Sequence, residues 1–150
     1  MVKQSEPQDH NSEYSIAVGL DGSNSAWKAF EEAIQVSLQK KARLHIVSIQ
    51  ESIDASYSAS EVLASEQTAQ EKLERIQIKA RLHAEDAGLK VETAIASGGS
   101  ATALVDYVKD KRINLLVVGD TGHSSIWGAL LGTTAEKIVR HAPCSVLVVR

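Results

Sequence analysis

Three glycines in the last third of the chain are spaced so that backbone amides around them could bind an anion. Gly119 ends an apolar run, Gly122 follows after two residues, and Gly132 follows after nine more, directly before Thr133. A glycine-bearing loop between a strand and a helix presents free N–H groups and the positive end of a helix dipole to a phosphate. The chain has no Gly-Lys-Ser/Thr and no dinucleotide fingerprint. The pattern therefore indicates a phosphate site that lacks the P-loop lysine.

A second interpretation of the same residues needs no ligand. Glycines are common in turns at strand ends and helix starts, and Thr133 with Glu136 has the spacing of a capping box. The two interpretations conflict, because a Glu136 carboxylate folded back on the helix start would repel a phosphate there. An occupied phosphate site therefore requires Glu136 to point away from the helix start.

Three other polar residues lie near these predicted loops. Asp21 follows the first apolar run, where it could bind a ligand or form an Asx turn that caps the next helix. Asp120 is expected to point to solvent, although a carboxylate there could also help to hold Mg²⁺ or repel a phosphate. His123 is expected on the loop surface, and in its protonated form it could contact a phosphate. The histidines show no metal-ligand spacing, and the chain has no nucleophile elbow.

Strand patterns alternate with helical patterns along the whole chain. Ser58 and Glu61 form a predicted capping box at the start of a long helix, whose inner side is marked only loosely by Leu63, Leu73, Ile76 and Ala80. Such alternation with fully apolar strands predicts an α/β fold, in which helices cover both faces of a parallel sheet. The expected strands are Tyr14 to Leu20, Arg43 to Ile49, Leu89 to Ala96, Leu115 to Val118 and Cys144 to Val149; the expected helices begin near residues 23–25, 58, 101 and 133.

The bulk properties favour one small domain in a reducing compartment. The chain has 150 residues, a formal net charge of −3 and one cysteine, Cys144, which is expected to be buried in the core. No apolar run approaches the roughly 20 residues that span a bilayer, and basic residues do not cluster, so neither a membrane nor nucleic acid is an expected partner. We expect a cytoplasmic protein with a disordered polar leader over 1–13 and one domain over 14–150.

The glycine spacing and its surroundings resemble a known family. The motif Gly119-x2-Gly122-x9-Gly132-Thr133, the preceding VVG and the closing HAPCSVLVV are similar to the ATP-binding branch of the universal stress protein family. The resemblance extends from Tyr14 to Arg150. It implies a Rossmann-like fold of the adenine nucleotide alpha hydrolase type, with a five-stranded parallel sheet in the order 3-2-1-4-5. In such a sheet, ligands bind at the switch point between the first and fourth strands, beyond their carboxyl ends.

The resemblance also implies a ligand and a set of contacts. ATP, or ADP or AMP, is the implied ligand, with Mg²⁺. The implied contacts to the nucleotide are Asp21 and Ile49 at the adenine, with Gly19 and Leu20 beside them; Val118 and Gly119 at the ribose; and Gly122, Gly132, Thr133 and Thr134 at the phosphates, where His123 is a further candidate.

The implied function is that of a nucleotide-responsive regulator in a stress response. It would act as a homodimer that pairs through the strand Cys144 to Val149. Two alternatives remain open: a nucleotide-free interaction dimer of the same fold, and a slow ATPase or autokinase. Because no phosphate-bridging lysine is present in the motif, bound ATP is expected to be held rather than rapidly hydrolysed.

Overall fold

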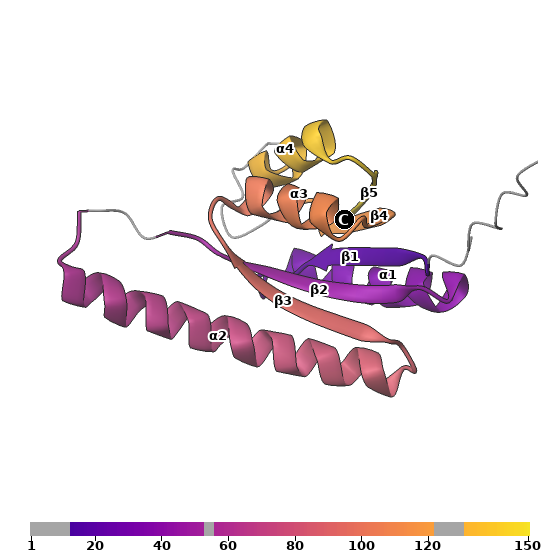
Figure 1. Ribbon diagram of the computed structural model, residues 1–150, viewed down its shortest axis with the longest axis horizontal. Helices are drawn as coiled ribbons and strands as arrows, with labels where there is room; N and C mark the ends of the chain where they lie inside the picture. The colour runs from indigo at the N-terminus through magenta and orange to yellow at the C-terminus, as the bar shows by residue number, and fades with distance from the viewer. Residues whose placement is uncertain (1–12, 53–55, 122–130) are drawn as a thin grey trace, which may run out of the picture.

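Five parallel strands and four helices alternate along the chain, as the sequence predicts. The computed structural model describes residues 13–52, 56–121 and 131–150, and Figure 1 shows the arrangement. The sheet has the order β3-β2-β1-β4-β5, and each pair of neighbours is parallel. In chain order the elements are β1 (Ser15–Gly19), α1 (Asn24–Lys40), β2 (Arg43–Gln50), α2 (Ala59–Asp86), β3 (Val91–Ser97), α3 (Ser100–Asp110), β4 (Leu115–Gly119), α4 (Thr133–His141) and β5 (Ser145–Val149). The predicted fold and strand order are confirmed.

The helices cover both faces of the sheet. In Figure 1, α3 and α4 lie together on one side of the sheet, and α1 and α2 lie on the other. Side chains alternate between the two faces along each central strand, so that Ile16 and Val18 face α1 and α2 while Ala17 faces α3 and α4. Two buried clusters result, and the central strands are apolar on both faces for that reason.

Of the two predicted capping boxes, the one on α2 is present and the one on α4 is wrong. Ser23 caps α1 by accepting a hydrogen bond from the Ala26 amide at 3.2 Å, and Ser58 with Glu61 forms a complete capping box on α2. The predicted box of Thr133 and Glu136 does not form, because the N-cap of α4 is Gly132 and has no side chain. Glu136 instead forms an ion pair of 3.0 Å with Arg140, one turn further along the helix. The start of α4 is therefore free of that carboxylate.

The buried side of α2 differs from the predicted one. Leu63 is 67% exposed and does not mark the inner side, whereas Leu73 and Ala80 are buried as predicted. Gln77 is also buried, at 5% exposure, although its polar side chain gives no apolar signal in the sequence. None of the described helices has the length and apolar character that crossing a membrane would require.

The two ends of the domain also refine the predictions. Residues 1–12 of the predicted leader lie outside the described residues, while Glu13 pairs with Arg43 at 3.0 Å and with Lys90 at 3.2 Å. Cys144 precedes β5 and is half-buried instead of fully buried, because β5 lies at the edge of the sheet. Its partial burial raises the pKa of the thiol, so the reactive thiolate form is disfavoured.

Candidate functional site

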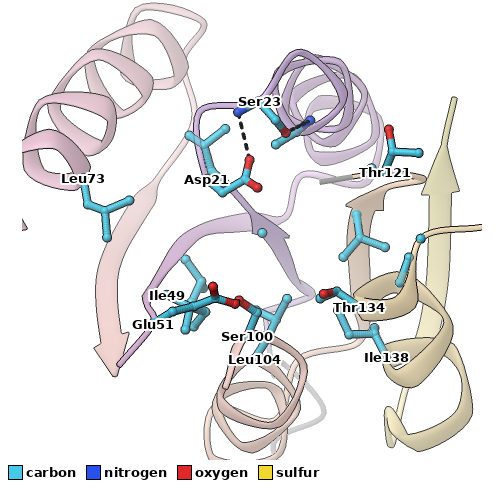
Figure 2. Close-up of a pocket in the computed structure, with 18 of the residues that line it drawn as sticks. Asp21, Ser23, Ile49, Glu51, Leu73, Ser100, Leu104, Thr121, Thr134 and Ile138 are labelled. Carbon is cyan, nitrogen blue, oxygen red and sulfur yellow. Dashed lines mark hydrogen bonds between the residues drawn. The ribbon is translucent and has the colours of Figure 1, made fainter. Parts of the chain in front are cut away.

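A cavity of about 450 Å³ lies beyond the carboxyl ends of β1, β2 and β4, where the strand order reverses. It is closed on the sides by α2, α3 and the start of α4 (Figure 2). The structure brings nine of the eleven predicted site residues together on its wall: Gly19, Leu20, Asp21, Ile49, Val118, Gly119, Gly132, Thr133 and Thr134. The other two, Gly122 and His123, lie outside the described residues.

One end of the cavity is largely apolar. Leu73 of α2, Leu104 of α3 and Ile49 at the end of β2 line this end, and Asp21 lies between them and α1 (Figure 2). The Asp21 carboxylate accepts a hydrogen bond from the Ser23 amide at 2.9 Å, so the Asx turn predicted for it is present. That turn fixes Asp21 at the cavity wall, where its carboxylate can accept a hydrogen bond.

The opposite end is formed by the start of α4 and the end of β4. Thr133 and Thr134 are the first residues of α4, and their N-cap, Gly132, offers no side-chain cap to the amides of the first turn. Those amides lie at the positive end of the helix dipole. This end of the cavity is therefore suited to an anion, and Glu136 does not compete for it.

Two of the motif glycines are required by packing within the protein. A Cβ atom on Gly119 would lie 2.8 Å from the carbonyl carbon of Ser25, and one on Gly132 would lie 2.9 Å from the carbonyl oxygen of Asp120. The Gly132 amide also donates a 2.7 Å hydrogen bond to that oxygen. Among the amides around the glycines, that of Gly132 is therefore already used within the protein. The glycines let β4, α1 and α4 approach one another, and the amides of the first turn of α4 remain for an anion.

The sequence interpretation expected Asp120 to point to solvent, but its side chain is held by hydrogen bonds within the protein. Its carboxylate accepts a hydrogen bond from the Ser25 hydroxyl at 3.0 Å and one from the Thr121 hydroxyl at 3.3 Å. The Ser25 hydroxyl oxygen in turn accepts from the Thr121 amide at 3.3 Å. Asp120 therefore ties the end of β4 to the start of α1 beside the anion-suited end of the cavity.

The sequence interpretation missed several residues of the wall. Leu73 and Leu104 are apolar residues of helices, and residue spacing cannot tell whether such side chains face the core or a cavity. Glu51 accepts a hydrogen bond from the Ser100 hydroxyl at the start of α3, and Lys72 reaches the wall from α2. Among the described wall residues Lys72 is the only lysine, arginine or histidine, while Asp21, Glu51 and Asp120 carry carboxylates. Within the described parts of the chain no three acidic, histidine or cysteine side chains gather as a metal site would need.

Comparison with known proteins gives one consistent result. The sequence model of the Universal stress protein family matches residues 14–150. A putative universal stress protein of Staphylococcus aureus is 35% identical over 140 residues, which cover 90% of this chain and 82% of that protein.

Solved structures agree with the sequence match. Universal stress protein UspA from Lactobacillus plantarum has a TM-score of 0.75 and 30% identity, covering 93% of this chain and all of that one. A universal stress protein in complex with cAMP has a TM-score of 0.72 and 29% identity, covering 91% of this chain and 97% of that one. The chain therefore belongs to the universal stress protein family.

Proposed function

We propose that the protein binds an adenine nucleotide in this cavity. The observation that carries the proposal is that nine residues implied by the family resemblance lie on one cavity, which has an apolar end and an anion-suited end. A similar protein that was solved in complex with cAMP supports an adenine nucleotide as the ligand. The volume of about 450 Å³ lies within the range of small-molecule sites.

The two ends of the cavity would bind different parts of the nucleotide. Ile49, Leu73 and Leu104 would cover the faces of the purine, and the Asp21 carboxylate would accept a hydrogen bond from its amino group. The phosphate would lie at the start of α4, held by the first-turn amides and by the hydroxyls of Thr133 and Thr134. Each such contact contributes about 0.3–2 kcal/mol, so the affinity depends on several contacts together and on burial of the purine.

ATP, ADP and AMP remain the candidate ligands, and the structure bears on how each would be held. The described phosphate end offers amides and hydroxyls together with the carboxylate of Asp120. Mg²⁺ would accompany ATP and be bound mainly by the phosphates, with the Asp120 carboxylate as a further candidate ligand on the cavity wall.

Thermal unfolding with and without nucleotide tests the proposal. AMP, cAMP and ATP with and without Mg²⁺ are added, and GTP serves as the control. At one hundred times the dissociation constant, a ligand stabilises the fold by about 2.7 kcal/mol, which raises the Tm by about 5–11 °C for a domain of this size. If no adenine nucleotide at millimolar concentration raises the Tm, the proposal is wrong.

One observation favours a second candidate, a nucleotide-free interaction protein of the same fold. Gly119 and Gly132 are both required by contacts within the protein, so the glycine motif by itself does not demand a ligand. The same thermal experiment decides between the two candidates. In the nucleotide-free case the cavity would remain open to solvent, and no adenylate would change the Tm.

The exposed edge of the sheet supports the proposal of a homodimer. β5 lies at the end of the strand order, with β4 as its partner within the described chain. The Val149 carbonyl accepts a hydrogen bond from the amide of Asp120, directly after β4. Because the backbone groups of successive strand residues point to opposite sides, those of Val148 point away from β4, towards the outer edge of the sheet. Antiparallel pairing of two such edges would cover them. Through this dimer, nucleotide occupancy would change which partner the protein contacts in a stress response.

Light scattering checks the dimer. The protein is expected to have twice the chain mass at micromolar concentration, and Val148→Pro is expected to give a folded monomer, because it removes only an outward N–H group. Leu147→Pro is the matched control, since it removes an amide that faces β4 and should disrupt the strand itself. A parent protein that is monomeric at this concentration contradicts the proposal.

A further inference from the structure

A buried glutamine connects α2 to two neighbouring strands. Gln77 lies on the inner side of α2 and is only 5% exposed. Its side-chain amide nitrogen donates one hydrogen bond to the Ser48 hydroxyl of β2 at 2.6 Å and one to the Ala94 carbonyl of β3 at 3.2 Å. Both hydrogens of the amide are therefore used, and the orientation of the side chain is fixed.

The chain of hydrogen bonds continues from Ser48 to the end of β1. The Ser48 hydroxyl oxygen accepts a hydrogen bond from Gln77, and the hydroxyl donates its own hydrogen to the Leu20 carbonyl oxygen at 2.6 Å. Leu20 also donates its amide to the Val47 carbonyl at 2.8 Å. β2 thus holds Leu20 on both its amide and its carbonyl side, directly before Asp21. Ser48 itself is 1% exposed, so water does not compete for these bonds.

The arrangement carries a cost that packing alone does not explain. The Gln77 side-chain oxygen is buried and has no hydrogen-bond partner among the described residues. An apolar side chain of similar length would fill the same space without leaving a buried acceptor unpaired. A geometric role accounts for an amide at this position, because its N–H occupies the acceptor side of the Ser48 hydroxyl and leaves the hydroxyl hydrogen for the Leu20 carbonyl.

We propose that Gln77 and Ser48 are positioning residues that hold Leu20, and thereby Asp21, at the purine end of the cavity. This inference rests on the proposed nucleotide function. Leu73, one turn before Gln77 on α2, lines the same end of the cavity. The network therefore holds two opposite walls of the purine end at a fixed distance from each other. It fixes Asp21 through Leu20, and it fixes Leu73 because Leu73 lies on the same helix as Gln77.

The chain offers a matched control for removal of the Ser48 hydroxyl. Ser37 on α1 is also fully buried, at 0% exposure, and its hydroxyl has no hydrogen-bond partner among the described residues. Ser48→Ala and Ser37→Ala remove the same atom from a buried site, but only the first removes a bond to Leu20. Ser48→Thr keeps the hydroxyl and suits a strand, so it serves as the conservative variant.

The test measures AMP affinity by calorimetry, and amide hydrogen exchange at residues 20–23 without ligand. Ser48→Ala is expected to weaken AMP binding about tenfold and to speed exchange at these amides about tenfold, whereas Ser37→Ala changes each less than about twofold. Ser48→Thr is expected to restore both values. Gln77→Met is expected to weaken AMP binding less than Ser48→Ala does. The double variant is expected to bind AMP as weakly as Ser48→Ala alone, because Gln77 acts through Ser48.

The outcomes separate this inference from the function on which it rests. If the parent binds AMP and Ser48→Ala binds it equally well, or no more weakly than Ser37→Ala, the positioning role is overturned while the proposed function stands. Unchanged exchange at residues 20–23 in Ser48→Ala overturns it as well. A parent that binds none of AMP, cAMP and ATP contradicts the proposed function, and the purine role of the network with it.

Discussion

Replacing Gly119 by alanine is expected to lower the free energy of unfolding by about 1–3 kcal/mol and to weaken nucleotide binding at least tenfold. The added Cβ would lie 2.8 Å from the Ser25 carbonyl carbon and 2.9 Å from its oxygen, which are backbone atoms that cannot rotate away. β4 cannot move freely, because the Asp120 amide donates to Val149 of β5 at 2.9 Å. The start of α1 must shift instead, and the hydrogen bond from Ser25 to Asp120 breaks with it.

A matched glycine provides the control for this substitution. A Cβ on Gly99 would meet no atom within 4 Å, and its φ of −70° is open to any residue. Gly99→Ala is expected to change the free energy of unfolding by no more than about 0.5 kcal/mol. Urea unfolding and AMP calorimetry are measured on both variants. Equal effects of the two substitutions would show that the close approach of Gly119 to Ser25 does not shape the site.

Replacing Phe30 by alanine is expected to lower the free energy of unfolding by about 3–5 kcal/mol, a large share of the stability of an ordinary domain. Phe30 is fully buried between α1 and the sheet. Its ring centroid lies 5.5 Å from that of Trp27, in an edge-on arrangement, and 5.9 Å from that of His83 on α2. The cavity left behind would loosen the contact between α1 and α2. Thermal unfolding should show a Tm lower by about 6–20 °C.

AMP affinity separates the Phe30 variant from the Gly119 variant. Phe30 is not part of the cavity wall, so at a temperature where Phe30→Ala is folded its AMP affinity should stay within about threefold of the parent. Leu63→Ala, at a position that is 67% exposed, serves as the stability control and should change little. A Phe30→Ala protein as stable as the parent would mean that the packing of α1 against α2 is wrongly described.

The sequence predicts the alternation of strands and helices well, because that alternation follows from patterns that local physics imposes. Apolar strands such as β4 can be buried only between two layers of helices. The turn of Asp21 to Ser23 and the capping box of Ser58 use short-range hydrogen bonds, which depend on neighbours in the chain. The strand order itself came from the family resemblance, since residue spacing does not give it.

The errors arise where contacts distant in sequence decide the structure. Thr133 and Glu136 have the spacing of a capping box, in which Thr133 would be the N-cap. The approach of Gly132 to Asp120 instead makes Gly132 the N-cap, one residue earlier. Leu63 matches a helical period, yet the sheet does not extend far enough to cover it. Asp120 looked solvent-directed because its partner Ser25 is 95 residues away in the chain.

Gln77 shows most clearly what residue patterns cannot supply. Its burial depends on a hydroxyl and a carbonyl from two strands that lie far from it in the sequence. A polar side chain on a helix is read as exposed unless its partners are known. The same holds for Leu73 and Leu104, whose apolar side chains predict burial but not whether they meet the core or a cavity.

A crystal structure of the protein grown with AMP would show directly whether the cavity at the switch point holds an adenine nucleotide. We expect a purine between Ile49 and Leu73, with its amino group at the Asp21 carboxylate and its phosphate at the amides of Thr133 and Thr134. An empty cavity at saturating AMP, or AMP bound elsewhere on the protein, would contradict this expectation.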